Sequence, residues 1–255
     1  MASVPQTALK TDTVTLHSGD ADILAYLVRP DAAGQYPIVV VLQEIFGVNA
    51  HIRDVTERIA QEGYIAIAPH LYHRQVQNFE VGYDDADVTL GRQYKVNTRN
   101  GELMSDIQAA IDYAHRLPQA KPGGVGTIGF CFGGHVAYLS ATLPETAAVA
   151  AFYGAGIPST TFGDGTPTMT RTPDITGKLY VFFGRDDHLI PPDDVAQVTA
   201  ALQQANTDAE VFEYEIFEYG GAGHGFFCDR RASYRPEAAA DAWEKVKQLF
   251  KETLG

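Results

Sequence analysis

The sequence contains little cysteine: only two of its 255 residues, Cys131 and Cys228, carry a thiol. Two cysteines are too few for the disulfide framework of a small secreted fold, although one bridge stays open. Basic residues are also scarce, with 19 Lys and Arg against 32 Asp and Glu and a formal net charge of -13. Because nucleic acids and anionic membrane surfaces attract basic faces, we expect neither as a partner.

Long hydrophobic runs are missing too. The longest, such as residues 38–42, are far shorter than the roughly 20 apolar residues that span a bilayer. The N-terminal stretch MASVPQTALKTDTVTL lacks the basic and then apolar segments of a secretory signal. We therefore expect a cytoplasmic protein. With no linker, internal repeat or low-complexity tract, the chain predicts a single domain over residues 1–255, with residues 1–10 disordered.

The chain does contain an alternation of strand and helix patterns. Short, largely apolar runs predict buried strands at residues 38–42, 64–68, 125–130, 148–153 and 179–184, and a further strand is predicted at residues 211–217. Apolar residues at helical spacing predict helices around residues 52–59, 103–114, 133–142, 193–205 and 242–249. Two further strands, residues 13–17 and 23–28, are joined by the turn Ser18-Gly19-Asp20.

This order predicts an α/β fold: a doubly wound, mostly parallel sheet with helices on both faces and an N-terminal antiparallel hairpin. Two long stretches, residues 73–101 and 154–176, interrupt the alternation. Long loops in a compact domain usually carry function or form a lid, and we expect the same of these two.

Gly129-Phe130-Cys131-Phe132-Gly133 fits the pattern Gly-x-nucleophile-x-Gly, with cysteine where serine is usual. The segment follows a predicted buried strand and opens a predicted helix, which is the context that this elbow requires. Its glycines leave room for a strained turn, and the helix N-terminus favours a thiolate and later an oxyanion. Cys131 is therefore the candidate nucleophile.

Candidates for an acid and a base follow later in the chain. Such an elbow is followed by an acid and then a histidine. Asp186 and Asp187 come after the predicted strand 179–184, and His224, between two glycines, comes after 211–217. Each lies past the carboxyl end of a strand, where open α/β sheets gather their sites. Spacing alone does not choose between the two aspartates.

Four segments together resemble the dienelactone hydrolase (carboxymethylenebutenolidase) family of α/β-hydrolases. They are Gln43-Glu44-Ile45-Phe46-Gly47, Gly129-Phe130-Cys131-Phe132-Gly133-Gly134, Asp187-His188 before Ile190-Pro191, and Gly223-His224-Gly225-Phe226. Their order and spacing cover nearly the whole chain from about Val14 onward. The resemblance implies an α/β-hydrolase fold and a carboxylic ester hydrolase with a catalytic triad: Cys131 as nucleophile, His224 as general base and Asp187 as its orienting acid.

The same resemblance gives Glu44 contact with the thiol in the resting enzyme, and makes the backbone N–H groups of Ile45 and Phe132 the oxyanion hole. Glu44 also follows a predicted strand and so lies at the carboxyl edge of the sheet, beside the elbow. A carboxylate there disfavours the thiolate until substrate displaces it, which would protect the cysteine from oxidation.

The substrate pocket departs from the family pattern. A pocket tyrosine matches Tyr94, but the arginine expected before it is out of register, and Cys228 holds the position of a second arginine. The candidate substrate-binding residues are Tyr94, Arg92, Arg230 and Arg231. Because the chain is acidic, an anionic substrate needs a local cluster of basic residues in its binding site. Arg99 and Lys95 are further candidates for this cluster.

The expected reaction is hydrolysis of an enol-lactone or carboxylic ester, of the dienelactone to maleylacetate type, through a cysteinyl thioester. The expected partner is a small-molecule lactone or ester that carries a carboxylate. No metal or organic cofactor is needed, and we expect a monomer or a small homo-oligomer.

Three alternatives stay open. The first is a carboxylesterase or thioesterase of broader specificity with the same triad. The second is a metal site, although its candidate ligands lack compact spacing; they are His70, His73, His135, His188 and Cys131. The third is a non-catalytic binding module, because a fold does not dictate a function. An intact triad argues against this last one.

Overall fold

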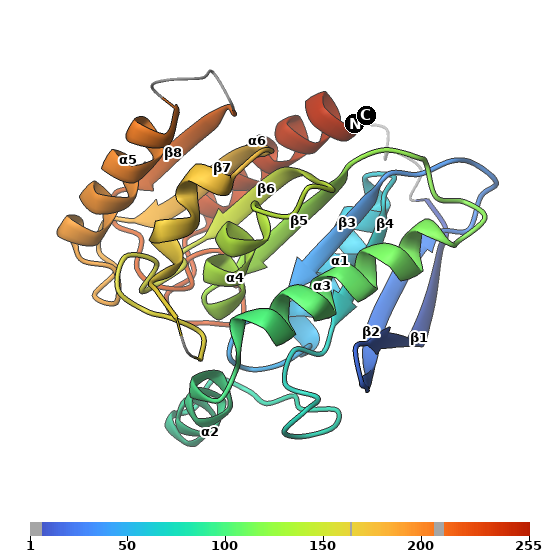
Figure 1. The fold of residues 1–255 in the computed structure, drawn as a ribbon, viewed down its shortest axis with the longest axis horizontal. Helices are drawn as coiled ribbons and strands as arrows, with labels where there is room; N and C mark the ends of the chain where they lie inside the picture. Colours follow the sequence, from blue (N-terminus) through green and yellow to red (C-terminus); the bar gives the residue numbers. More distant parts are fainter. Residues whose placement is uncertain (1–6, 164, 207–211) are drawn as a thin grey trace.

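The computed structural model describes residues 7–163, 165–206 and 212–255, which contain one eight-stranded sheet with helices on both faces (Figure 1). The strands are β1 (Leu9–Ser18), β2 (Ala21–Pro30), β3 (Ile38–Leu42), β4 (Ile65–Pro69), β5 (Val125–Phe130), β6 (Thr146–Phe152), β7 (Lys178–Gly184) and β8 (Tyr214–Tyr219). The helices are α1 (Ala50–Gln61), α2 (Asp85–Val96), α3 (Asn100–His115), α4 (Phe132–Ser140), α5 (Pro192–Asn206) and α6 (Pro236–Leu254), with a 3₁₀ helix η1 (Thr168–Asp174).

The order across the sheet is β1-β2-β4-β3-β5-β6-β7-β8. β1 pairs with β2 and β2 with β4 in antiparallel fashion, and every pair from β4 to β8 is parallel. The expected doubly wound, mostly parallel sheet with an N-terminal hairpin is therefore confirmed.

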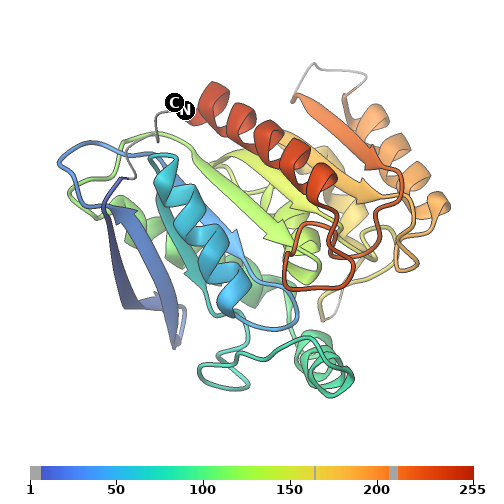
Figure 2. The same ribbon diagram turned by 180° about the vertical axis from the view of Figure 1, so that it is seen from behind.

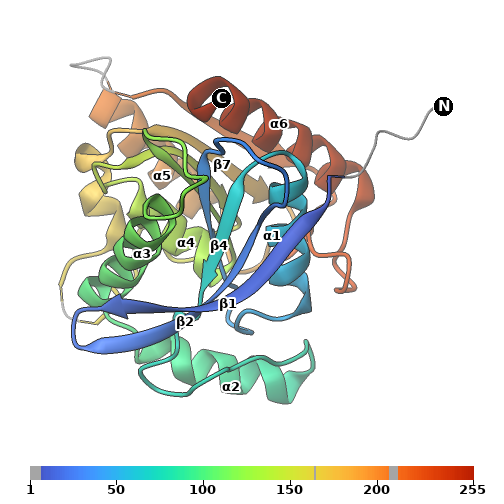
Figure 3. The same cartoon turned by 90° about the vertical axis from the view of Figure 1, so that its right-hand side faces the viewer.

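Two layers of helices enclose the sheet. α3, α4 and α5 lie on one face (Figure 1), and α1 and α6 on the other (Figure 2). α2 belongs to neither layer and projects beyond one edge of the sheet (Figure 3). Within the described part of the chain, no helix is long and apolar enough to cross a membrane.

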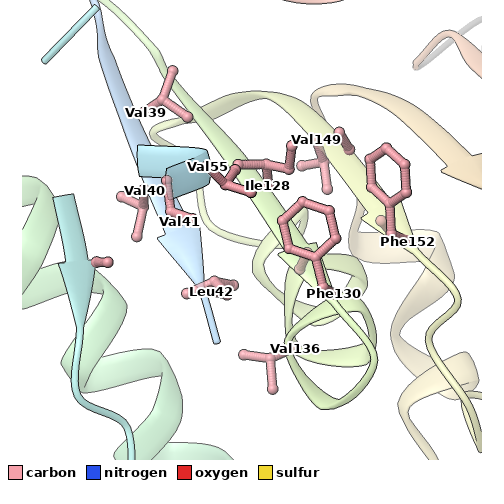
Figure 4. Close-up of a cluster of buried hydrophobic side chains, with 14 of the residues drawn as sticks. Val39, Val40, Val41, Leu42, Val55, Ile128, Phe130, Val136, Val149 and Phe152 are labelled. Atoms are coloured by element: carbon pink, nitrogen blue, oxygen red, sulfur yellow. The ribbon is translucent and has the colours of Figure 1, made fainter. Parts of the chain in front are cut away.

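The core lies around the central strands β3 and β5, all of whose residues are buried. Figure 4 shows Val41 and Leu42 of β3 and Ile128 and Phe130 of β5 in one apolar cluster with side chains of neighbouring elements. Leu42 lies opposite Gly129 in the register, so the two strands end together. The residues that follow them, Glu44 and Cys131, therefore emerge at the same edge of the sheet.

The stretch 73–101 contains α2, which the apolar pattern did not predict. The helix begins at a polar cap, where the backbone N–H of Asp87 donates to Asp84 Oδ1 at 2.9 Å. Only Gly91 of this helix is buried. Because α2 has no buried apolar stripe, its sequence lacks the periodicity by which the other helices are found. The stretch 154–176 likewise contains η1.

The predicted bounds differ from the observed ones mainly in the edge strand β8 and in the N-terminal residues. The strand predicted at 211–217 is Tyr214–Tyr219, and Val211 lies outside the described residues. This edge strand pairs with β7 alone and is only partly buried, so its sequence lacks a continuous apolar run. Of the N-terminal residues expected to be disordered, 1–6 lie outside the described part, and Leu9 and Lys10 begin β1.

Candidate active site

Cys131 occupies the turn between β5 and α4, with φ 56° and ψ -114°. A positive φ is strained for a residue with a side chain and costs about 1–3 kcal/mol. Two backbone hydrogen bonds hold the turn: the Cys131 N–H donates to the carbonyl of Phe152 at 3.0 Å, and its carbonyl accepts from the N–H of His135 at 3.1 Å. The thiol is thereby presented at the carboxyl edge of the sheet.

The elbow glycines are required by close backbone contacts. A Cβ on Gly129 would lie 2.0 Å from the carbonyl oxygen of Gly133, and one on Gly133 would lie 2.3 Å from that of Leu42. Gly129→Ala should therefore lower the free energy of unfolding by about 3 kcal/mol, because the clash is with backbone that cannot turn away. Urea denaturation measures this change. The matched control is Gly220→Ala, where an added Cβ would meet no atom within 4 Å; an equal loss in both would contradict the steric argument.

His224 and Asp187 lie beside the elbow, on the loops after β8 and β7. His224 Nδ1 is 2.8 Å from Asp187 Oδ2, and the other carboxylate oxygen of Asp187 accepts from the N–H of Leu189 at 2.9 Å. Both side chains are buried, whereas Asp186 is exposed. His224 Nε2 is buried and has no hydrogen-bond partner of ordinary geometry among the described residues. One ring nitrogen is thus anchored and the other is free for chemistry at the thiol.

Electrostatics couple His224 to Cys131. Burial alone would raise the pKa of the Cys131 thiol, but the neighbouring His224 outweighs it, and the net shift is downward. Burial alone would lower the pKa of His224, but the negative charges of Cys131 and Asp187 raise it to about 10. Both shifts favour a thiolate beside an imidazolium, the reactive form of a cysteine nucleophile.

We expect the alkylation rate of Cys131 by iodoacetamide to rise with pH at a midpoint below that of an ordinary thiol, because the thiol pKa is lowered. In His224→Ala the lowering charge is gone, so burial raises the thiol pKa and the rate at pH 7 should fall by more than about tenfold. The rate should then climb with pH beyond the range of an ordinary thiol. Identical pH profiles in the two proteins would show that His224 does not lower the pKa of the Cys131 thiol.

Glu44 is fully buried beside the elbow, and its partner is Arg231 rather than the thiol. Glu44 Oε1 accepts from Arg231 Nη1 at 2.9 Å. Among the described residues, no hydrogen bond joins Glu44 to Cys131, and Glu44 Oε2 has no partner. The guanidinium of Arg231 also lies over the rings of Phe46 and Tyr83, at 5.7 and 5.6 Å from their centroids. The expected contact of Glu44 with the thiol is therefore replaced by an ion pair.

A pocket of about 300 Å³ opens above Cys131. Ile45 and Phe132 line it, and their backbone N–H groups donate to no acceptor in the described part of the chain. These two N–H groups, one after β3 and one at the start of α4, are the donors that the sequence suggests for an oxyanion.

The wall of the pocket opposite the sheet is α2, which contributes Val88, Arg92 and Lys95. Their spacing of four and three residues puts them on one face of the helix. Tyr94 falls on another face and packs against Tyr72 and Phe79, so it does not line the pocket. Tyr94, the predicted pocket tyrosine, thus lies on a face of α2 that does not line this pocket.

The remaining basic candidates divide in the same way. Arg231 lines the pocket, whereas Arg230 is exposed and does not, and neither does Arg99. His188, Leu189 and Ser233 also line it. Ser233 lies in a segment without strand or helix periodicity and carries no signal that sequence reasoning could use; His188 could be found from its place next to Asp187.

The candidate ligands of the alternative metal site, Cys131 and the four histidines, form no group of three metal-binding atoms among the described residues. Both cysteines are free. His135 uses both ring nitrogens in contacts with the carbonyl of Ala155 at 3.0 Å and the hydroxyl of Thr168 at 2.7 Å. His73 lies 3.4 Å from Asp106, in a buried network with Arg74. His73 and His135 therefore have structural partners.

Comparison with known proteins agrees with this architecture. A model of the "Dienelactone hydrolase family" matches residues 23–254. A protein of Synechocystis named "Putative carboxymethylenebutenolidase" is 53% identical over 96% of this chain and 98% of its own length. A protein of the same name from Yersinia pestis is 34% identical over 92% of this chain and 86% of its own.

The crystal structure of a "Putative Dienelactone Hydrolase" from Klebsiella pneumoniae superposes with a TM-score of 0.86 at 33% identity, covering 96% of this chain and 99% of that one. Together with the mostly parallel sheet and the strand–elbow–helix around Cys131, these matches establish the α/β-hydrolase fold. The chain belongs to the dienelactone hydrolase family and is a hydrolase of lactones or esters.

Proposed function

We propose that the protein hydrolyses a small enol-lactone or ester that carries a carboxylate, through a thioester on Cys131. The observation that supports it most directly is the placement of His224, whose Nδ1 lies 2.8 Å from Asp187 while its Nε2 is left free on the side of the thiol. Nucleophile, base and orienting acid in this relation make an acyl-transfer triad.

The first half of the reaction forms the thioester. The sulfur of Cys131 attacks the carbonyl carbon, and the N–H groups of Ile45 and Phe132 hold the oxyanion, each donor contributing about 3 kcal/mol. The ring C–O bond then breaks, and the oxygen leaves as an enolate, a good leaving group. The imidazolium of His224 supplies its proton to this oxygen and becomes neutral.

The second half releases the product. Neutral His224 takes a proton from water, whose oxygen attacks the thioester carbonyl, and the C–S bond breaks to return the Cys131 thiolate. Asp187 stabilises the imidazolium that this proton transfer creates and holds the ring in one tautomer.

The charge of the pocket supports an anionic substrate. Arg92, Lys95 and Arg231 all line it, and this basic spot offsets the negative field of an acidic protein locally. A substrate carboxylate beside Arg231 would compete with Glu44 for the guanidinium. Glu44 raises the pKa of the Cys131 thiol. Binding of substrate to the pocket would therefore change the ion pair of Glu44 with Arg231, and with it the pKa of the thiol.

A substrate panel tests the proposal. We would measure kcat/KM for cis- and trans-dienelactone, for a neutral aryl ester such as p-nitrophenyl acetate, and for an acyl thioester. The proposal expects the carboxylated lactones to be preferred by at least about tenfold, as one charge-assisted hydrogen bond in the pocket would give. Preference for the neutral aryl ester or the thioester would instead establish an esterase or thioesterase of broader specificity.

Charge removal on α2 should act on KM. Arg92→Gln is expected to raise KM for a carboxylated lactone by about tenfold, with kcat and the rate on a neutral ester nearly unchanged, because it loses a charged contact to the carboxylate. Lys95→Gln should raise KM in the same way, and should also raise the pKa of the Cys131 thiol, which Lys95 lowers. Arg230→Gln is the matched control, since this neighbouring cation is exposed and outside the pocket. An equal rise of KM in the control would point to a general field effect rather than direct binding.

A further inference from the structure

Three buried side chains behind the active site bring unlike metal-binding atoms together. Glu44, His51 and Cys228 each offer one ligand atom, and these atoms all lie within 4.8 Å of one another. All three residues are almost completely inaccessible, at 0%, 1% and 0% exposure. The three atoms are a carboxylate oxygen, an imidazole nitrogen and a sulfur, which is a donor set that zinc and related transition metals prefer.

Two members of this cluster lack the partners that burial demands. Both ring nitrogens of His51 and the Oε2 atom of Glu44 have no hydrogen-bond partner in the described part of the chain. His51 instead faces the rings of Phe130 and Phe227, with centroids at 5.5 and 6.3 Å. Leaving such groups unpaired costs about 1–3 kcal/mol each, so the cluster has a deficit that a bound ligand would remove.

The hydrogen bonds around the cluster leave metal-binding atoms available, although the guanidinium of Arg231 beside Glu44 opposes a cation. Arg231 takes only the Oε1 atom of Glu44, which leaves Oε2 available. The thiol of Cys228 donates to the hydroxyl of Tyr83 at 3.3 Å, and that hydroxyl also accepts from the amide of Asn49 at 3.2 Å. If the thiol gives its proton to solvent, the Tyr83 hydroxyl can turn and donate to the thiolate, as outer-shell groups of metal sites do.

One cavity adjoins the cluster at His51, although Glu44 and Cys228 do not line it. His51 lines a cavity of about 290 Å³ between α1 and α6, the two helices on the face shown in Figure 2. Asp229 and Glu244 line the same cavity and favour entry of a cation, although Arg58 is also there, over the ring of Trp243. The cavity differs from the substrate pocket, and its lining does not include Cys131.

We propose that Glu44, His51 and Cys228 form a site for one transition-metal ion of the zinc type, reached from the cavity between α1 and α6. A tetrahedral zinc ion separates its ligand atoms by about 3.5 Å, so closing the set needs side-chain movements of about an ångström. Water from the cavity supplies the fourth ligand. Because Glu44 also pairs with Arg231, which lines the substrate pocket, an anionic substrate that binds Arg231 would free Glu44 for the metal.

Co²⁺ is the probe for this site, because a cobalt–thiolate bond gives a charge-transfer absorption band that a carboxylate–imidazole site lacks. The decisive protein is Cys131→Ala, which keeps Cys228 as its only thiol. Titrated under reducing, oxygen-free conditions, it should bind one equivalent of Co²⁺, show the thiolate band, and lose the band when Zn²⁺ is added. Absence of stoichiometric binding or of the band in Cys131→Ala would overturn the proposal.

Two ligand variants complete the test. Cys228→Ser should remove the band in the Cys131→Ala background, and His51→Gln should weaken Co²⁺ binding by more than about 100-fold, beyond the effect of an outer-shell change. Thermal unfolding establishes that each variant is folded. Full-strength binding in a folded His51→Gln protein would also overturn the site. Since the readout is metal binding by a protein without its nucleophile, the outcome does not depend on the proposed hydrolysis.

Discussion

Cys131→Ala should lower kcat for lactone and ester hydrolysis by about 10⁴- to 10⁶-fold. Without the thiol, no thioester can form, and only the oxyanion donors and the pocket remain to assist water, as in other triad enzymes that lose their nucleophile. The measurement is steady-state turnover of the best substrate from the panel, followed to high enzyme concentration so that a residual rate can be quantified.

This loss must come from chemistry rather than unfolding. The φ of 56° at position 131 is strained for alanine as it is for cysteine, so the substitution should change the melting temperature little. Mass spectrometry of acid-quenched wild-type enzyme should find the acyl group on the peptide that contains Cys131, and no acyl adduct in the variant. Retained turnover in a folded Cys131→Ala protein would falsify the nucleophile assignment.

Asp187→Asn should lower kcat by about 10³- to 10⁴-fold while leaving KM nearly unchanged. The Asp187 carboxylate accepts from His224 Nδ1 at 2.8 Å; an amide there can donate instead, which stabilises the wrong tautomer and cannot stabilise the imidazolium. The pKa of His224 should fall as well, because one of the charges that raise it is removed.

The adjacent carboxylate provides the control. Asp186 is exposed, and Asp186→Asn removes the same charge one residue away from the contact with His224. We expect turnover within about twofold of the parent, because an exposed charge is screened by solvent. A comparable loss in Asp186→Asn would mean that net charge at the end of β7, and not the contact with His224, determines the rate.

The strands of the sheet interior are the part of this fold most readable from the sequence. Residues 38–42 and 125–130 are strands with the predicted bounds, because each is covered on both faces and so consists of apolar or small residues throughout. The same reasoning shifts the bounds of the edge strand β8 and misses the exposed helix α2. Neither buries a continuous apolar surface, so neither leaves a periodic mark in the sequence.

The pocket was less predictable for a related reason. A residue's place in a pocket depends on the phase of its helix, and α2 turns Arg92 and Lys95 toward the site while Tyr94 packs against Phe79. A shift of one or two residues along a helix moves a side chain to another face. The position of a matching residue in the sequence therefore does not determine whether it touches substrate.

The sequence by itself determined the α/β architecture, the elbow around Cys131, the candidate base His224 and the two candidate acids Asp186 and Asp187. These features depend on local patterns: apolar runs, close glycines, and polar residues at strand ends. The family resemblance already assigned Asp187 to His224, and the tertiary structure shows their contact. Only the tertiary structure decided that Arg231 rather than Arg230 reaches Glu44, and that His51 and Cys228 meet behind them. Such contacts join side chains from distant segments, and their geometry is set by the packing of the whole domain.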